Sequence, residues 1–279
     1  MSKPFLLLDA DWFAYNASAA CEKEIKWNDH FWTLHSDINE AICKVEDDIA
    51  KVCTDLGSKD FVLCFSDSAN WRKEVMPSYK ANRLDKRKPL CLYPLIEYLK
   101  EKYPYEQRES LEADDIMGIL ATLPSYQNDR KKIIVSIDKD LLQIPAWHYN
   151  PNKDYQEHEV TQEEADRFYL CQAFAGDAVD GFSGCPTIGV ETARTLIDEK
   201  VIYVPFVHTF KSGKRKGETE HRWQKVTGES QSAWETIVST YRKHGLSESV
   251  ALSNARVARI CRACDYNFKN KEVKLWQPH

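Results

Sequence analysis

Three short runs of apolar residues each end at an acidic residue. They span residues 5–8 before Asp9, residues 61–65 before Ser66 and Asp67, and residues 133–137 before Asp138. Between them, residues 37–56 and 112–123 carry apolar side chains every three or four positions, which is the spacing of an amphipathic helix. Short strands that alternate with helices predict an α/β fold with a central, mostly parallel sheet flanked by helices.

The second half of the chain has a different pattern. Residues 161–164 form a Thr-Gln-Glu-Glu capping box, which predicts a helix that runs to about Ala175. Residues 176–189 are rich in turn-forming residues, and residues 190–199, 234–244 and 247–264 are expected to be helical. No strong strand is expected beyond Leu141. The pattern therefore predicts an α/β core over residues 1–160 and a helical part over residues 161–279 that is structurally continuous with it.

Acidic residues gather where the predicted strands end. Because parallel strands place their carboxyl ends at one edge of a sheet, we expect their aspartates to lie close together. Nine acidic residues are candidates for one site: Asp9, Asp67, Glu112, Asp114, Asp115, Asp138, Asp140, Asp177 and Asp180. Ionised carboxylates in one pocket repel one another unless cations are bound, and Mg²⁺ prefers such oxygen ligands. Two such ions can activate a water and stabilise the leaving oxygen of a phosphodiester.

The charge of the chain does not exclude a polyanionic partner. The 279 residues have a formal net charge of −5, with 43 acidic and 38 basic residues. Without the nine candidate acids, 34 acidic residues remain against the same 38 basic ones, a net charge of +4. No apolar run approaches the ~18 residues of a membrane span, and the N-terminal run is too short for a signal peptide. Nine scattered cysteines favour reduced thiols in a cytosol.

Basic residues concentrate in two segments. Residues 72–88 contain seven basic residues against two acidic ones, and residues 211–217 contain four basic residues, followed by Arg222, Trp223 and Lys225. Each segment taken alone is typical of a solvated charged loop. Beside a metal-binding acidic edge, basic residues interleaved with Tyr, Trp and Gly favour a nucleic-acid substrate. In residues 181–189, the glycines suit backbone N–H contacts to a phosphate, although an ordinary helix–helix turn has the same pattern.

Some of the same residues have other interpretations. An aspartate after a strand is commonly a turn residue or helix cap, and Asp11 is expected to be a cap. Asp9-Ala-Asp11 also resembles the nucleophile motif of haloacid-dehalogenase-type phosphatases, which would make Asp9 a covalent nucleophile. A third hypothesis is a non-catalytic, structure-specific DNA-binding protein, but acids near phosphates weaken binding unless metals are present. Cys261-Arg-Ala-Cys264, a lone C-x-x-C pair in a predicted helix, is interpreted as core packing rather than a zinc site.

Taken together, the motifs resemble those of the flap endonuclease/5′–3′ exonuclease superfamily. The resemblance rests on Leu-Asp9, Ser-Asp67 with Trp71-Arg72, Tyr79-Lys-Ala-Asn-Arg83, Leu-Glu112-Ala-Asp-Asp115, Ile-Asp138-Lys-Asp140 and Gly-Asp177-Ala-Val-Asp180-Gly. The motifs Phe210-Lys-Ser-Gly-Lys-Arg-Lys-Gly217, Ala258-Arg-Ile-Cys-Arg262 and Tyr266-Asn-Phe with Lys274-Leu-Trp276 extend it towards short-tailed bacteriophage 5′–3′ exonucleases. It implies a PIN-like fold, a helical arch over residues 71–110 and a helix–turn–helix-type element over about residues 175–196.

The resemblance also implies two metal ions, Mg²⁺ or Mn²⁺. The first would be held by Asp9, Asp67, Glu112 and Asp114. The second would be held by Asp138, Asp140 and Asp177, with Asp115 and Asp180 acting through shared ligation or water. Lys80 would lie by the scissile phosphate, with Arg83 and Tyr79 gripping the substrate near it.

The remaining implied contacts are with DNA. They would come from Arg72, Ser183, Gly184, Ile188, Gly189, Lys214, Arg215 and Lys216, together with Tyr79, Lys80 and Arg83. The helix–turn–helix-type element would bind K⁺ through backbone carbonyls and the Ser183 hydroxyl. Cys185-Pro186-Thr187 departs from the usual Val-x-Gly of relatives, and Pro186 removes one N–H donor from this loop.

The implied function is a metal-dependent 5′–3′ exonuclease with flap endonuclease and RNase H-like activity. Its implied partners are double-stranded DNA with 5′ ends or flaps and RNA–DNA hybrids. The resemblance also implies a monomer that acts in the cytoplasm of an infected bacterial host. There it would remove RNA primers during phage replication and degrade DNA.

Overall fold

The computed structural model describes residues 3–83, 86–128 and 130–278 and divides into two compact units. Unit 1 comprises residues 1–71, 85–165 and 260–274, and unit 2 comprises residues 72–84, 166–259 and 275–279. Each unit therefore draws on sequence from both sides of residue 160, and the domain boundary predicted there stays a prediction.

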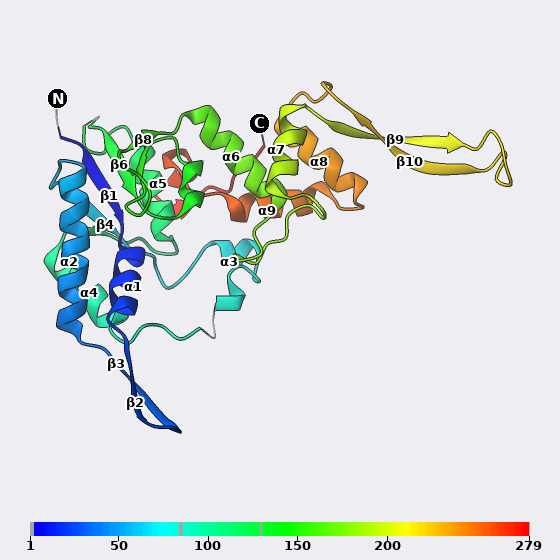
Figure 1. The fold of residues 1–279 in the computed structure, drawn as a ribbon. Helices are drawn as coiled ribbons and strands as arrows, with labels where there is room; N and C mark the ends of the chain where they lie inside the picture. The colour runs from blue at the N-terminus through cyan, green and yellow to red at the C-terminus, as the bar shows by residue number, and fades with distance from the viewer. Residues whose placement is uncertain (1–2, 84–85, 129, 279) are drawn as a thin grey trace. The chain divides into compact units, whose positions relative to one another are not determined.

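Unit 1 is built on a six-stranded sheet with the strand order β5-β4-β1-β6-β7-β8 (Figure 1). The strands are β1 (Phe5–Asp9), β4 (Phe61–Cys64), β5 (Tyr105–Glu106), β6 (Lys132–Val135), β7 (Trp147–Tyr149) and β8 (His158–Glu159). All neighbouring strands are parallel except β7 and β8, which are antiparallel. The predicted central, mostly parallel sheet is confirmed.

Strand β1 lies between β4 and β6 in the middle of the sheet, and helices cover both of its faces. All five of its residues are buried, and Leu7 aligns with Val62 of β4 on one side and with Ile134 of β6 on the other. Strands covered on both faces are apolar at almost every position, which is why the sequence shows runs rather than alternation. Leu6 and Leu8 point into a core shared with three helices, and a fourth helix packs on β1, β4 and β6.

Unit 1 has four α-helices among its described residues. They are α1 (Ala10–Ala20), α2 (Ile38–Asp55), α4 (Leu92–Lys102) and α5 (Ala113–Thr122). Helices α1, α2 and α4 share the core with Leu6 and Leu8, and α5 is the fourth helix. The predictions for residues 37–56 and 112–123 are confirmed, each within one residue. A hairpin of β2 (Lys23–Asn28) and β3 (Phe31–His35), which is almost entirely exposed, was not predicted.

Residues 260–274 belong to unit 1, and the helix predicted over residues 247–264 is shorter than expected. Helix α9 (Glu248–Ala258) is followed by a short 3₁₀ helix, η3 (Ala263–Asp265), and by strands β11 (Tyr266–Asn267) and β12 (Glu272–Val273). The N–H groups of Ile260 and Cys261 donate to Gln143 Oε1 (3.2 Å) and Asp115 Oδ1 (2.9 Å). Because these donors bond side chains, they do not continue the helix. Cys261 is buried but Cys264 is exposed, so the expectation of two core cysteines is wrong for Cys264.

Unit 2 is mostly helical. Its helices are α3 (Arg72–Val75), η1 (Ala81–Arg83), α6 (Gln162–Ala175), α7 (Val190–Asp198), α8 (Ala233–Lys243) and α9. Phe174, Leu196, Ile237 and Tyr241 are buried together in its core. The helices predicted over residues 161–175, 190–199 and 234–244 are confirmed within one residue. Across the described parts of both units, no helix is long and apolar enough to cross a membrane.

Unit 2 also contains a long antiparallel ribbon of two strands, β9 (Ile202–Thr209) and β10 (Thr219–Val226). Figure 1 shows it in yellow, extending away from α7 and α8. Together with β7 and β8, the ribbon contradicts the expectation that no strand follows Leu141. Most of its residues are exposed on both faces. The ribbon therefore lacks the alternation of apolar and polar residues that identifies a strand with one buried face.

Arg72 is a buried cation that holds the end of α9. Its side chain is 2% exposed. Its Nε donates to the carbonyl oxygen of Val257 (2.9 Å) and its Nη2 to that of Arg259 (2.6 Å). The last carbonyls of a helix have no partner within the helix, so this guanidinium supplies donors that the backbone lacks.

We expect Arg72→Ala to lower the free energy of unfolding by about 3 kcal/mol, because two buried carbonyls lose a charged donor. The matched control is Lys73→Ala, at the next and exposed position, which should change it by less than about 0.5 kcal/mol. Urea denaturation followed by circular dichroism measures both. If the two variants unfold at the same urea concentration, the carbonyls do not depend on Arg72.

Candidate active site

Asp9 ends the central strand and begins the next helix. Its Oδ1 accepts the N–H of Trp12 (3.2 Å), which caps α1, and its Oδ2 accepts the hydroxyl of Ser136 (2.6 Å), just beyond β6. The side chain is 7% exposed. The pKa of Asp9 is raised to about 7, chiefly by burial and then by the charges of Asp11 and Asp138, although the hydrogen bonds from Ser136 and Trp12 lower it. Asp9 is therefore a carboxylate that needs a proton or a cation nearby.

Asp11 belongs to the same acidic group, although it was expected to be only a cap. Asp9 is the residue that caps α1, while Asp11 Oδ2 accepts the N–H of Ser66 (3.0 Å). Burial is the main cause that raises the pKa of Asp11, and the charge of Glu112 adds to it. Asp9, Asp11, Glu112 and Asp138 thus lie within electrostatic reach of one another in a chain of neighbours. The structure therefore brings three of the predicted acids, Asp9, Glu112 and Asp138, into one group, and their roles in the site stay predictions.

Asp67, three residues beyond the end of β4, is held in its ionised form. Its Oδ2 accepts the N–H of Ser110 (2.8 Å), and this bond is the largest cause that lowers the pKa of Asp67. The cation of Lys100, on α4, also lowers the pKa of Asp67 and of Asp11. Sequence reasoning missed Lys100, because no helix was predicted around it and a single lysine gives no signal of a site.

The start of α5 presents three acidic residues. Glu112 caps the helix, and its N–H donates to Asp115 Oδ2 (3.3 Å). Asp114 is half-buried, whereas Asp115 is fully buried and accepts Trp71 Nε1 (3.1 Å) in addition to the N–H of Cys261. Asp115 therefore ties the helix that carries Glu112 and Asp114 to the rest of unit 1. Its predicted part in metal binding stays a prediction.

Ser66 and Ser136 are two further site residues that sequence reasoning did not single out. The hydroxyl of Ser66 accepts the N–H of Ala113 at the start of α5 (2.9 Å), while its own N–H bonds Asp11. The hydroxyl of Ser136 accepts the N–H of Asp138 (3.1 Å) and donates to Asp9. Each serine links segments that are far apart in sequence. The available signal was their place directly after a buried strand.

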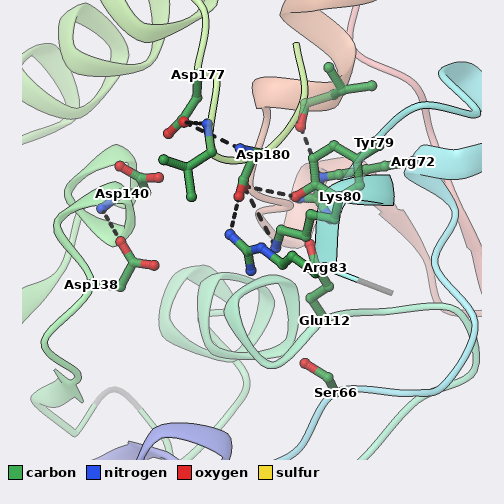
Figure 2. Close-up of polar contacts among 12 residues, drawn as sticks. Ser66, Arg72, Tyr79, Lys80, Arg83, Glu112, Asp138, Asp140, Asp177 and Asp180 are labelled. Atoms are coloured by element: carbon green, nitrogen blue, oxygen red, sulfur yellow. Dashed lines mark hydrogen bonds and ion pairs between the residues drawn. The ribbon is translucent and has the colours of Figure 1, made fainter. Parts of the chain in front are cut away.

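Asp138 and Asp140 lie on the turn after β6 that leads into a 3₁₀ helix, η2 (Lys139–Gln143). The N–H of Asp140 donates to Asp138 Oδ1 (2.8 Å), as Figure 2 shows. Asp138 is exposed and Asp140 is half-buried. The backbone bond fixes the spacing of these two carboxylates.

The donor set of unit 1 is the kind that suits a hard divalent cation. Its members are carboxylate oxygens, and the mutual charge of Asp9, Asp11 and Asp138 is relieved when a cation is near. Within the described residues, no three His, Cys, Asp or Glu side chains are already arranged to hold one metal ion. Magnesium keeps several of its waters, so few direct carboxylate bonds are needed for it.

The remaining two acidic candidates, Asp177 and Asp180, belong to unit 2. Asp177 exchanges two backbone hydrogen bonds with Phe182 (2.8 and 3.0 Å), and its Oδ1 accepts the N–H of Val179 (2.7 Å). Asp180 accepts the hydroxyl of Tyr79 (3.2 Å) and forms ion pairs with Lys80 (3.6 Å) and Arg83 (Figure 2). Asp180 is thus bonded to the three residues that were predicted to grip the substrate.

The basic residues of the first predicted DNA-binding segment differ in exposure. Arg83 is exposed and Lys80 is half-buried, with the Lys80 cation 5.0 Å from the centre of the Tyr79 ring. Tyr79 and Arg72 are buried, and both Arg72 contacts described above are to backbone carbonyls. Lys80 and Arg83 are therefore the accessible cations among the four, and the predicted DNA contacts of all four stay predictions.

The turn of residues 181–189 depends on a close approach of two glycines. A Cβ on Gly184 would lie 2.3 Å from the backbone of Ala175 and Gly176, so only glycine fits there. Gly189 caps α7 with φ −91° and open space around it, so the fold itself does not require glycine at this position. Ser183 is exposed and Ile188 is half-buried. The helix–turn–helix function of this turn stays a prediction.

We expect Asp9→Asn to stabilise the protein in EDTA. A folded-state pKa near 7, above the ordinary 3.8, means that the folded state keeps a proton which the unfolded state has lost. The free energy of unfolding should therefore fall as pH rises from about 4 to 7, by up to about 4 kcal/mol. Asp9→Asn should remove most of this fall and unfold at a higher temperature than wild type at pH 8.

Thermal denaturation between pH 4 and 8 measures the effect, and Asp47→Asn, on the exposed face of α2, is the matched control. The control should follow the wild-type curve. An Asp9→Asn protein that is less stable than wild type at pH 8 would contradict the crowding of charge at this edge.

Comparisons with known proteins agree with this architecture. A family model described as "5'-3' exonuclease, N-terminal resolvase-like domain" matches residues 4–167. An exodeoxyribonuclease of Enterobacteria phage T3 is 36% identical over 287 residues, covering 99% of this chain and 93% of the relative. An exonuclease of Escherichia phage T7 is 35% identical over 287 residues, with 99% and 94% covered.

Solved structures of the bacteriophage T5 enzyme share the fold. One, crystallised with metal ions, has a TM-score of 0.58 at 13% identity, covering 91% of this chain and 88% of that chain. Another, the T5 flap endonuclease in complex with DNA and metal ions, has a TM-score of 0.57 at 14% identity, with the same coverage. The expected flap-endonuclease-like fold and the expected class of enzyme are confirmed. A family model that matches over half of the chain, and relatives alike over nearly all of it, show that this chain belongs to the 5′–3′ exonuclease family.

Proposed function

We propose that the chain hydrolyses phosphodiester bonds of duplex nucleic acid from 5′ ends by a two-metal mechanism. The observation that carries this proposal is the row of crowded carboxylates at the carboxyl edge of the sheet, Asp9, Asp11, Glu112 and Asp138. Such crowding is destabilising without cations, and is therefore a feature that folding alone does not favour. Family membership and relatives that are exonucleases of phages support the same activity.

The ions, Mg²⁺ or Mn²⁺, would divide the carboxylates into two sets. Asp9, Asp67, Glu112 and Asp114 would hold the first, and Asp138, Asp140 and Asp177 the second. When bound, two divalent ions supply an activated water and stabilise the leaving oxygen. Asp115 would act by keeping the start of α5 in place, since its carboxylate accepts Trp71 Nε1 and the N–H of Cys261.

Lys80 and Arg83 would contact the phosphates next to the cut. Without substrate, both cations bond Asp180, and a phosphate offers them the same kind of acceptor. Substrate binding would then release Asp180 from both cations.

The substrate class would be double-stranded DNA with 5′ ends or flaps, and the RNA strand of RNA–DNA hybrids. The T5 relative is a flap endonuclease that has been crystallised with DNA, which supports the flap substrate. The turn of residues 181–189 would assist binding, with K⁺ at Ser183, and the buried Arg72 would act through the end of α9 that it holds. The protein would act as a monomer in the cytoplasm of the infected host, in primer removal and DNA degradation.

One incubation tests this function against its alternatives. Duplex, 5′-flap and RNA–DNA hybrid substrates, each 5′-labelled, are incubated with Mg²⁺ or EDTA, beside a mononucleotide. We expect short labelled products with Mg²⁺ and none with EDTA. Phosphate released from the mononucleotide would favour the phosphatase with Asp9 as nucleophile. Binding without cleavage under every condition would favour the non-catalytic DNA-binding protein.

We expect Asp138→Ala and Asp140→Ala each to reduce turnover at saturating Mg²⁺ by at least about 100-fold. Each variant removes a carboxylate that would hold a metal ion. The metal ion would stabilise the negative charge of the transition state, an effect of about 3 kcal/mol or more. Asp47→Ala, exposed on α2, is the control and should keep wild-type turnover. Circular dichroism verifies folding. Near-native turnover in either site variant would remove that residue from the metal set.

We expect Lys80→Ala to slow single-turnover cleavage by about 100-fold while weakening substrate binding far less. A cation beside the scissile phosphate acts mainly on charge that develops in the transition state, an effect on the order of 3 kcal/mol. Lys86→Ala, exposed in the same basic segment, is the matched control. Rapid-quench kinetics and fluorescence anisotropy measure the two effects. Equal losses of rate and affinity would reduce Lys80 to a general phosphate contact.

A further inference from the structure

The β9–β10 ribbon, residues 202–226, is the most basic feature of this otherwise acidic chain. It contains six Lys and Arg residues against two Glu, a formal net charge of +4, whereas the whole chain carries −5. The strands pair from Ile202 with Val226 to Thr209 with Thr219, eight residue pairs in register. At about 3.3 Å per residue, this is an arm roughly 26 Å long. Figure 1 shows it leaving α7 and α8 with no other segment of unit 2 along most of its length.

The base of the ribbon is fixed, so the arm is not merely a long loop. The N–H of Tyr203 donates to Ser239 Oγ on α8 (3.1 Å), and the cation of Lys243 lies 4.0 Å from the centre of the Tyr203 ring. Lys225 pairs with Glu199 (3.1 Å), at the end of α7. These contacts hold both strands at their base and leave the rest in solvent.

The tip of the ribbon carries cations that are available to an external anion. Lys211, Lys214 and Lys216 are exposed, and none has a carboxylate partner in the part of the chain that the structure describes. Arg215 is different, because it pairs with Glu218 (2.7 Å) and Glu220 (3.2 Å) and lies 4.0 Å from the centre of the Phe210 ring. Arg215 therefore rigidifies the tip while the three lysines face solvent.

We propose that the β9–β10 ribbon enters the major groove of B-form duplex DNA, with the tip lysines on the flanking phosphates. This inference rests on the proposed function, since it assigns an arm for the same duplex substrate. The major groove is about 12 Å wide and about 8.5 Å deep, which admits a two-stranded ribbon whose strands are about 5 Å apart. The net charge of the ribbon is the complement of the phosphate backbone.

The shape of the ribbon selects among nucleic acids. An A-form RNA duplex has a deep, narrow major groove that side chains do not enter, and a single strand has no groove. The ribbon should therefore add affinity for duplex DNA and little for either of the others. Its free edges are poorly suited to pairing with another chain, because Pro205 lacks an N–H and lysines crowd the tip.

Two variants test the proposal. The first replaces residues 205–223 with Asn-Gly, which joins the paired residues Val204 and Gln224 by a two-residue hairpin turn and keeps the base of the ribbon. The second is Lys211→Gln/Lys214→Gln/Lys216→Gln. Its matched control is Lys51→Gln/Lys59→Gln/Lys153→Gln, which makes the same change of charge at exposed positions of unit 1.

Fluorescence anisotropy in EDTA measures the Kd of each protein for duplex DNA, duplex RNA and single-stranded DNA over a range of salt. We expect both ribbon variants to weaken duplex DNA binding by at least about tenfold. The lysine variant should also lower the slope of log K against log salt by about 3, the number of phosphate contacts removed. The Kd of the control protein for duplex DNA should change by less than about threefold. The Kd of the ribbon variants for duplex RNA and for single-stranded DNA should also change by less than about threefold.

Dimethyl sulfate footprinting identifies the groove, because it modifies guanine N7 in the major groove and adenine N3 in the minor groove. Wild type should protect N7 positions that the shortened ribbon leaves open.

Equal loss of affinity for all three nucleic acids, or protection of N3 alone, would overturn groove entry. Unchanged binding would do so too, and would leave exposed Val207 and Trp223 as a surface for a protein partner. If the wild type cleaves DNA and the ribbon variants bind DNA normally, the proposed role of the ribbon is refuted but the proposed function is not.

Discussion

The buried charge at the end of the central strand is the constraint on which the catalytic edge depends. Asp9 is enclosed by neighbouring segments, accepts hydrogen bonds from Trp12 and Ser136, and still has a pKa raised to about 7, because burial and the charges of Asp11 and Asp138 outweigh those bonds. A fold selected for stability alone would place an apolar residue there. This edge is therefore stable only when a proton or a cation compensates its negative charge. The repulsion that destabilises it without a cation is the same property that favours metal binding.

The protein accommodates its other candidate carboxylates in different ways. Asp115 is fully buried but accepts N–H groups from Trp71, Glu112 and Cys261, so its charge is met by donors. Asp67 accepts the N–H of Ser110, which lowers its pKa. Hydrogen-bonded and paired carboxylates are stable as ions, whereas those that face one another are not. The same residue type thus fixes the scaffold at Asp115 and forms the reactive edge at Asp9.

Acidic and basic residues are concentrated in different parts of the chain, which the net charge of the whole chain does not reveal. The acidic edge forms around the strands of unit 1, and the ribbon of unit 2 carries a formal +4 within a chain of −5. A nuclease needs both features, because metals bind acids and the phosphate backbone binds bases. A uniform mixture of the same residues would serve neither purpose.

The sequence by itself determined the α/β architecture, most of the helices and the meeting of acids at one edge, whereas α1 and α4 were not predicted. Runs such as residues 5–8 and 133–137 are apolar because both faces of a parallel strand are covered, and a strand that ends in aspartate leaves it at the carboxyl edge. The structure bears this out for Asp9, Glu112 and Asp138. The boundaries of most predicted helices were equally accessible, since caps such as Asp37 act on residues next to them in sequence, but the predicted end of α9 was wrong.

Contacts between distant residues were decided only by the tertiary structure. Asp11 was expected to be a cap, but its role follows from the N–H of Ser66, 55 positions away. The guanidinium of Arg72 lies in a basic segment, yet bonds carbonyls about 185 positions on. The ribbon escaped prediction because neither of its faces is buried, and periodicity records burial. Local pattern encodes which residues leave water, whereas the partner that each polar group finds depends on how the segments pack.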